Sequence, residues 1–218
     1  MSQRREQRYE FEGVPIDPVP LGTNVLVAGP ALGGIRELLL QLLVGGEDEG
    51  TLFISADVSA SEVLADFEQA GGRQTNVRIV DCSQGEETAD TDRVKTITSP
   101  GDLTGIGMQF SALYEGLYAD GIERVRTGIY TLTPLLVYSE DVRSIYRFLH
   151  TITGRIRAAD GLGVCAIDPT AQDDRTLSSI AQAFDCRLDL RENGKGHEIR
   201  MRGMESQSGD WRAFDPRG

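Results

Sequence analysis

Short apolar runs alternate along this chain with longer segments whose apolar residues recur at helical spacing. The short runs are rich in Val, Ile and Leu and are bounded by turn-forming residues, which predicts buried strands. These expected strands cover 24–28, 51–55, 77–80, 125–132 and 163–167. Helical spacing between and after them predicts helices over 35–44, 59–70, 103–118, 139–159 and 177–184. Strands that alternate with helices predict an α/β fold, in which a parallel sheet is covered on both faces.

The last part of the chain departs from this alternation. Residues 186–190 and 197–203 each alternate apolar and polar positions, and a turn that contains glycine lies between them. This pattern predicts an antiparallel hairpin that extends one edge of the sheet. Residues 83–99 are polar and carry no periodic pattern, so we expect a long exposed loop there.

The chain has 218 residues, a length that suits one domain at ~100–200 residues per domain. Trp211 and Phe214 lie beyond the expected hairpin, and we expect them to pack back onto the domain. The expected parts are a lead-in over 1–20, one domain over 21–203 and a tail over 204–218.

The composition excludes several classes of protein. The formal net charge is −12, from 34 acidic and 22 basic residues, which argues against broad non-specific binding of nucleic acid. The only lysines are Lys95 and Lys195. An acidic chain that is rich in arginine suits a salt-adapted cytosol, and a GC-rich genome is the alternative explanation. No run approaches the ~18 apolar residues of a membrane span, and residues 1–10 lack the apolar core of a secretory signal, so we expect a cytoplasmic protein.

The three cysteines are Cys82, Cys165 and Cys186, and they are far apart in the sequence. They form no metal-binding spacing with each other or with the two histidines, His150 and His197. We therefore expect buried free thiols in a reducing compartment and no metal site.

A glycine-rich turn between the first expected strand and helix carries the strongest chemical signal. It reads GPALGGIR from Gly29. A phosphate-binding loop reads GxxxxGK[ST], in which backbone N–H groups surround phosphates, the lysine contacts them and the hydroxyl holds Mg²⁺. Gly29 and Gly34 occupy the two glycine positions, and Gly33 fits the loop. However, Ile35 stands at the lysine position and Arg36 at the hydroxyl position.

Asp57, Asp81 and Asp168 each follow an expected strand. The carboxyl ends of parallel strands line the ligand crevice of an open α/β sheet, so the three carboxylates could gather as a polar or metal site. Aspartate also caps helices and turns after strands, and we expect this simpler role for them.

With these segments in place, the chain resembles the RecA/KaiC-like branch of the P-loop ATPases, in particular short single-domain archaeal members. The resemblance spans about residues 20–203. It rests on PVPLGTNVLVAGP from Pro18, FISAD from Phe53, GIYTLTPLLVY from Gly128 and the terminal hairpin. It implies a three-layer RecA-like fold and an acidic residue after the second strand that activates water, at or beside Asp57. It also places Tyr130 where the family's metal-linked aspartate stands.

These departures bear directly on the expected chemistry. Phosphoryl transfer depends on positioned cations that neutralise developing charge, and this chain lacks the loop lysine, the metal-binding hydroxyl and the metal-linked carboxylate together. We therefore expect no efficient ATP hydrolysis, no catalytic residue and no required cofactor. Any remaining nucleotide site is degenerate, and it consists of Gly29, Gly33, Gly34, Arg36 and Asp57.

The resemblance then favours a regulatory or scaffolding subunit that pairs with RecA/KaiC-like subunits or with another protein. One alternative is an ATP-binding ATPase in signalling or DNA repair, in which Arg36 and Asp57 replace the lost groups. A second alternative is a DNA-binding recombinase paralogue. Against this second alternative, the connection after the fifth strand is short and acidic, DPTAQDDR from Asp168.

Overall fold

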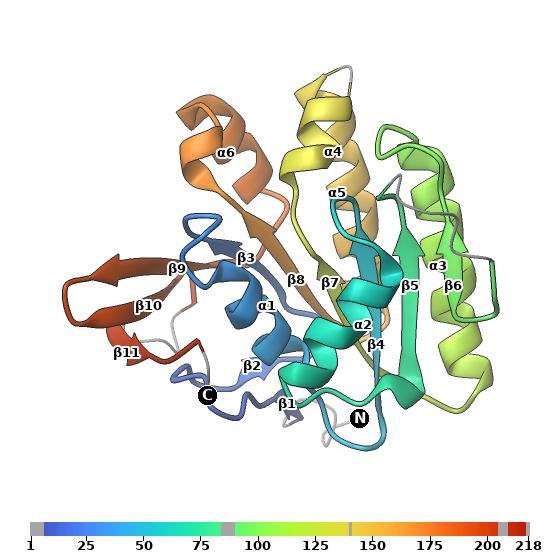
Figure 1. The fold of residues 1–218 in the computed structure, drawn as a ribbon, viewed down its shortest axis with the longest axis horizontal. Helices are drawn as coiled ribbons and strands as arrows, with labels where there is room; N and C mark the ends of the chain where they lie inside the picture. The colour runs from blue at the N-terminus through green and yellow to red at the C-terminus, as the bar shows by residue number, and fades with distance from the viewer. Residues whose placement is uncertain (1–6, 84–89, 140, 205–208, 217–218) are drawn as a thin grey trace.

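The structure, a computed structural model, describes residues 7–83, 90–139, 141–204 and 209–216. Within these residues, a sheet has the strand order β11-β10-β9-β3-β8-β7-β4-β5-β6 (Figure 1). From β9 to β6 the neighbours are parallel, and β10 and β11 continue the sheet antiparallel. The strands are β3 (Asn24–Ala28), β4 (Glu49–Ser55), β5 (Val77–Asp81), β6 (Val94–Thr96), β7 (Arg124–Ile129), β8 (Leu162–Ile167), β9 (Cys186–Asn193), β10 (Gly196–Arg202) and β11 (Arg212–Phe214).

Helices cover both faces of this sheet, and each face has its own apolar cluster. Helices α1 (Ile35–Leu43) and α2 (Ala60–Gln69) bury their apolar side chains in one cluster. Helices α3 (Leu103–Ala119), α5 (Val142–Ala158) and α6 (Asp174–Ala181) contribute to the other. The expected α/β architecture, with a mainly parallel sheet and a terminal antiparallel hairpin, is therefore confirmed.

Three expected boundaries were wrong, and each error has a local cause. The strand expected over 125–132 ends at Ile129, because the chain turns after Tyr130 into a short helix, α4 (Thr133–Tyr138). The next helix, expected to begin at residue 139, therefore begins at Val142, and Asp141 caps it. The helix expected over 177–184 covers Asp174–Ala181, because the Asp173 carboxylate caps it by accepting from the Thr176 N–H.

The expected loop over 83–99 is only partly a loop. Its described residues include β6, which pairs with β5 at the far edge of the sheet. Residues 84–89 lie outside the described residues. A strand of three residues is too short to show a periodic pattern, so its extended conformation depends on its pairing with β5.

The lead-in and the tail both pack on the domain. Strands β1 (Arg8–Tyr9) and β2 (Val19–Pro20) pair antiparallel, and the Tyr9 side chain is completely buried. The guanidinium groups of Arg124 and Arg126 lie 4.7 and 5.1 Å from the centre of its ring. At the other end, β11 extends the hairpin and buries Phe214, which confirms that the tail packs on the domain.

The cysteines are unpaired and buried, as expected. Burial raises the pKa of Cys82 and of Cys186 to about 12, and it also raises the pKa of Cys165. All three are therefore neutral thiols near pH 7, with little nucleophilic or metal-binding character.

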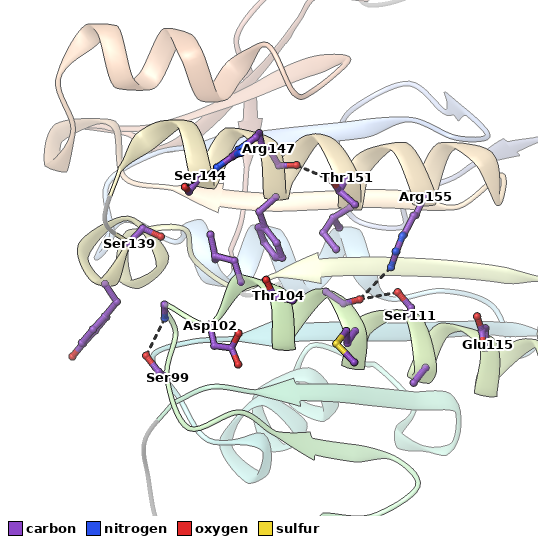
Figure 2. A pocket seen from close by; sticks show the side chains of 18 residues that line it. Ser99, Asp102, Thr104, Ser111, Glu115, Ser139, Ser144, Arg147, Thr151 and Arg155 are labelled. Atoms are coloured by element: carbon purple, nitrogen blue, oxygen red, sulfur yellow. Dashed lines mark hydrogen bonds between the residues drawn. The ribbon is translucent and has the colours of Figure 1, made fainter.

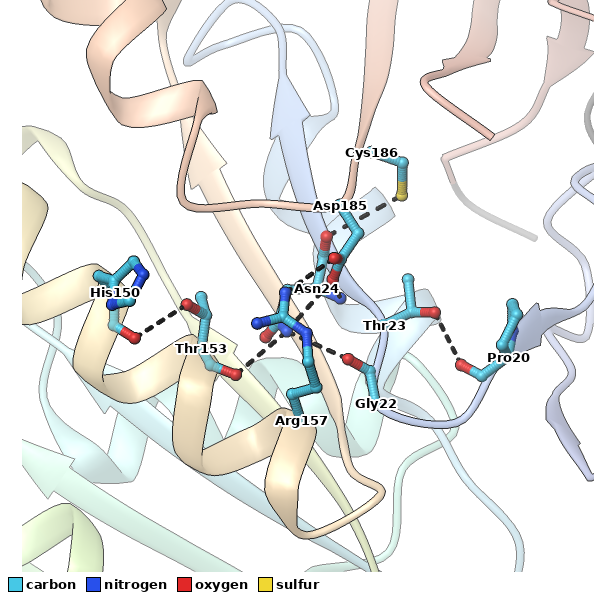
Figure 3. Close-up of polar contacts among 9 residues, drawn as sticks. All are labelled: Pro20, Gly22, Thr23, Asn24, His150, Thr153, Arg157, Asp185 and Cys186. Atoms are coloured by element: carbon cyan, nitrogen blue, oxygen red, sulfur yellow. Dashed lines mark hydrogen bonds and ion pairs between the residues drawn. The ribbon is translucent and has the colours of Figure 1, made fainter. Parts of the chain in front are cut away.

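A polar network joins β3, α5 and the start of β9 at the amino ends of the parallel strands (Figure 3). The Asn24 side chain is completely buried, and its amide donates to the carbonyls of Gly22 and Thr153, each at 3.2 Å. The Asn24 backbone N–H donates to Asp185 Oδ2 at 2.8 Å, and Arg157 pairs with Asp185 Oδ1 at 2.7 Å. These bonds satisfy the buried N–H groups of the Asn24 amide and the carbonyls that accept from them.

We expect Asn24→Ala to lower the free energy of unfolding by about 2–3 kcal/mol, because it leaves buried acceptors without their donor. Urea denaturation followed by circular dichroism measures this change. The matched control is Asn76→Ala, in which the lost amide makes one long bond, at 3.4 Å to the Glu47 carbonyl. Equal losses in the two variants would contradict a structural role for the Asn24 network.

Candidate functional site

The glycine turn lies at the carboxyl end of β3 and leads directly into α1. The Gly33 N–H donates to the Pro30 carbonyl at 2.9 Å, and Gly34 caps α1 in the left-handed region with φ of 83°. A Cβ on Gly29 would lie 2.9 Å from the Leu190 Cβ of the hairpin. Gly29 is thus required by close packing, and Gly34 by its backbone conformation. Leu32, at the tip of the turn, is fully exposed.

The tail lies against the start of α1. A Cβ on Gly34 would be 2.9 Å from the Pro216 Cγ and 3.6 Å from Nε2 of His197. Gln41, two turns along α1, donates its side-chain N–H to the Pro216 carbonyl at 3.1 Å. The segment after β11 therefore runs beside the helix terminus where a phosphate-binding loop would hold its ligand.

A carboxylate already binds the glycine turn. Asp168, directly after β8, accepts from the Ala31 N–H at 3.2 Å and from the Thr170 N–H at 2.8 Å. Desolvation opposes ionisation of this carboxyl, but hydrogen bonds from the Thr170 hydroxyl and from the N–H groups of Thr170 and Ala31 outweigh it, so its pKa is lowered. An N–H group that would face phosphate in a phosphate-binding loop thus has an internal anion as its partner.

Arg36 is turned away from the tip of the turn and toward α2 and β7. Its guanidinium lies 4.9 Å from the centre of the Tyr130 ring, 3.6 Å from Asp57 Oδ2 and 3.8 Å from Asp66 Oδ2. The Tyr130 hydroxyl donates to the same Asp66 oxygen at 2.7 Å. Arg36, Asp57, Asp66 and Tyr130 form one cluster of mutually paired side chains, which we call the Arg36 cluster.

Burial controls the protonation of the Arg36 cluster. Burial raises the pKa of Asp57, and the charge of Arg36 opposes this shift. Burial also raises the pKa of Tyr130 well above its ordinary value, and the hydrogen bond to Asp66 raises it further. Tyr130 is therefore a neutral hydrogen-bond donor at neutral pH, and the cluster has a formal charge of −1 when both carboxylates are ionised.

The structure brings several of the expected site residues together, and it adds one residue that the sequence analysis did not include. Gly29, Gly33 and Gly34 form the turn, while Arg36 and Asp57 lie side by side behind it. Ile35 is buried in the apolar cluster on this face of the sheet. Asp66 was missed, because its part in the site depends on which face of α2 packs toward β7.

The three aspartates that follow strands do not meet. Asp57 pairs with Arg36, and Asp168 binds the glycine turn. Asp81 Oδ2 accepts from the Ala60 N–H at 2.7 Å, at the start of α2. Among the described residues, no three His, Cys, Asp or Glu side chains gather closely enough to hold a metal ion.

The side chains present do not fit a nucleotide–magnesium complex. The lysine position is a buried isoleucine, and the nearby cation is Arg36, which two carboxylates and an aromatic ring hold. At the position that the resemblance assigns to the metal-linked aspartate, Tyr130 offers a neutral hydroxyl that is already donated to Asp66. Mg²⁺ prefers carboxylate oxygens and water, so this arrangement supplies neither the charge nor the ligands that the metal needs.

A larger hollow lies on the opposite face of the sheet, between α3 and α5 (Figure 2). Its volume is about 1140 Å³, and Met108 and Tyr138 at its border are 67% and 54% exposed. Arg155 Nη1 and the Ser111 hydroxyl both donate to the Gly107 carbonyl, at 3.1 and 2.7 Å. Two of its polar side chains are thus paired within the protein, and the hollow is separate from the glycine turn.

Comparisons with known proteins agree with this architecture. A family model matches residues 22–190, and it describes a family of unknown function, DUF7504. This chain belongs to that family. The search of curated proteins found no match.

Among the described residues, no helix is both long and apolar enough to cross a membrane.

Among solved structures, the fold is similar to a KaiC-like protein from the hyperthermophilic archaeon Pyrococcus horikoshii OT3. The TM-score is 0.68, the sequence identity is 16%, and 97% of each chain is covered. At this identity the likeness is one of fold, and it confirms the RecA/KaiC-like architecture expected from the sequence.

We expect Tyr130→Phe to lower the free energy of unfolding by about 1–2 kcal/mol, because it removes the hydrogen bond to Asp66 and keeps the ring. Chemical denaturation measures this change. Tyr138→Phe is the matched control: its side chain is 54% exposed, and its effect should stay within about 0.5 kcal/mol. The Arg36 cluster would not be a stabilising unit if both variants behaved alike.

Proposed function

We propose that this protein is a RecA/KaiC-like ATPase homologue that does not hydrolyse ATP and acts as a regulatory or scaffolding subunit. The observation that carries this proposal is the internal pairing of Arg36 with Asp57, Asp66 and Tyr130. This pairing lies where an active relative would need a free cation and a metal-linked carboxylate.

Charge supports the same conclusion. A triphosphate requires positive charge around it, and transfer of its terminal phosphoryl group requires more as the transition state forms. The Arg36 cluster has a formal charge of −1 with both carboxylates ionised, and the Asp168 carboxylate binds the turn from the other side. Both features disfavour a polyanionic ligand at the glycine turn.

Exposed apolar side chains near the carboxyl ends of the parallel strands support a partner-binding role. Leu32 is fully exposed in the turn after β3, and Val137 and Tyr138 of α4, which follows β7, are 70% and 54% exposed. Exposed apolar side chains mark protein interfaces where they form a continuous patch, as the adjacent Val137 and Tyr138 can begin to do. The partner would be a second RecA/KaiC-like subunit or another protein. The acidic, lysine-poor composition favours a salt-adapted cytoplasm, and the family resemblance favours an archaeal one.

One observation favours the alternative of an ATP-binding protein. The Arg36 side chain is 40% exposed, and its two ion pairs, at 3.6 and 3.8 Å, are long. Such a guanidinium could rotate toward a phosphate if a nucleotide bound at the turn. In that case Arg36 would act as the missing cation, with Asp57 beside it.

Isothermal titration calorimetry with Mg²⁺–ATP separates the two proposals. We expect no binding at micromolar nucleotide, because the cluster neutralises Arg36. In a separate assay of phosphate release, we expect no signal above that of buffer. Micromolar binding that Arg36→Ala abolishes would establish the alternative. Arg73→Ala is the matched control, because it removes a guanidinium from the surface, where Arg73 pairs with Glu47 at 2.6 Å.

A further inference from the structure

The terminal hairpin gathers several of its arginines on one face. In β9, the polar residues Arg187, Asp189 and Arg191 alternate with Leu188 and Leu190. The two leucines belong to the apolar cluster on the α1 face of the sheet. Because successive side chains of a strand point to opposite faces, the charged side chains of β9 lie on the other face.

Strand β10 continues this charged face, and Trp211 lies over it. The strand register places Arg200 opposite Asp189 and Arg202 opposite Arg187. Trp211, just before β11, lies with its ring 3.9 and 4.4 Å from the guanidinium carbons of Arg191 and Arg200. We call this surface the basic platform. It consists of Arg187, Asp189, Arg191, Glu198, Arg200, Arg202 and Trp211.

The arginines of the basic platform are held in place by their neighbours. The Asp189 side chain is only 9% exposed, and it pairs with Arg187 at 2.7 Å and with Arg202 at 2.6 Å. Arg191 pairs with Glu198 at 2.7 Å and stacks on Trp211. Each guanidinium carries five N–H donors, and one carboxylate uses at most two of them. Donors therefore remain for another anion, on side chains that have already lost much of their freedom.

The local charge is opposite to that of the whole chain. Four arginines and two carboxylates give the basic platform a formal charge of +2, whereas the whole chain has −12. The side chains of Arg191 and Arg202 are each 49% exposed. Figure 1 shows β10 and β11 at the edge of the sheet, beyond the helices.

We propose that the basic platform binds an acidic segment of a protein partner through the carboxylates of that segment. The inference deepens the proposed partner-binding role and rests on it. It adds the surface and the chemistry of the partner. The bidentate geometry of a guanidinium matches a carboxylate, and complementary charge guides the encounter.

Two observations favour an acidic polypeptide over single-stranded nucleic acid. Recognition of single strands relies on aromatic rings that stack on bases, and the Trp211 ring already stacks with two guanidinium groups. A nucleic acid also brings one charge per nucleotide to a chain whose net charge is −12. A few well-placed carboxylates suit a local charge of +2 better.

The spacing of the two most exposed arginines defines a probe. Arg191 is opposite Glu198, and Arg202 lies four residues further along β10, about 13 Å away at 3.3 Å per residue. In an extended peptide, carboxylates at every second residue lie on one face and match such a distance. The probe is therefore a fluorescein-labelled peptide of 12 residues that alternates Glu and Ser.

Fluorescence anisotropy with the full chain measures binding of this peptide. We expect Arg191→Gln/Arg202→Gln to weaken binding by about tenfold or more. The matched control is Arg143→Gln/Arg175→Gln, which removes the same charge from two exposed arginines of α5 and α6, and it should change binding less than about twofold. Circular dichroism checks that both variants keep the fold.

The other outcomes overturn the inference in distinct ways. Absence of peptide binding, or equal binding of a Gln–Ser peptide, rules out recognition of carboxylates. Equal losses in the two double variants mean that net charge alone attracts the peptide. The last outcome is that a 12-nucleotide oligo-dT binds more tightly than the peptide. If the platform variant abolishes that binding, the partner is a nucleic acid and not a protein. None of these outcomes alters the calorimetric result with ATP, so failure of this inference and failure of the non-hydrolysing role can be told apart.

Discussion

The contact between the buried Asn24 and Asp185 sets the strand alignment on which both ends of the molecule depend. Asn24 begins β3 and Asp185 directly precedes β9, so the hydrogen bonds between them fix how these two parallel strands align. The same alignment brings Leu190 against Gly29 at the far end of β3. The positions of the glycine turn and of the basic platform therefore both depend on the register between β3 and β9. A slip of one residue would exchange the two faces of β9, placing arginines in the core and leucines in solvent.

This constraint is specific because a buried amide tolerates few arrangements. The Asn24 side chain has no exposure, and its amide group bonds to the carbonyls of Gly22 and Thr153. Its oxygen faces Gly163 on β8, where a Cβ would lie 2.2 Å from it. Position 163 thus requires glycine because a side chain there would clash with Asn24, and not because of its backbone conformation. Polar groups buried in this way contribute little net stability, but misplacing them costs the full desolvation of each unpaired group.

Local sequence patterns were sufficient for the longer strands and helices, because their apolar residues repeat with a regular period. They were insufficient where a partner decides the structure: β6 and β11 have three residues each and exist through pairing with β5 and β10. At the candidate site, the loop motif together with the family resemblance was enough to associate Arg36 with Asp57. It could not reveal Asp66, because the contact with Tyr130 depends on how α2 packs, nor could it show that Arg36 is turned toward them.

The distribution of arginine also explains how a strongly acidic chain could recognise an acidic partner. At ~1 M salt the Debye length is only ~3 Å, so the repulsion between two acidic surfaces is largely screened and direct contacts decide binding. A guanidinium such as that of Arg200, which Asp189 and Trp211 hold, loses little further side-chain entropy when it binds, whereas a free lysine would lose more. Near the glycine turn an arginine has the opposite effect on anion binding, because the carboxylates of Asp57 and Asp66 offset the charge of Arg36. One residue type is thus paired internally behind the glycine turn and, in the proposal above, supplies a contact surface at the edge of the sheet.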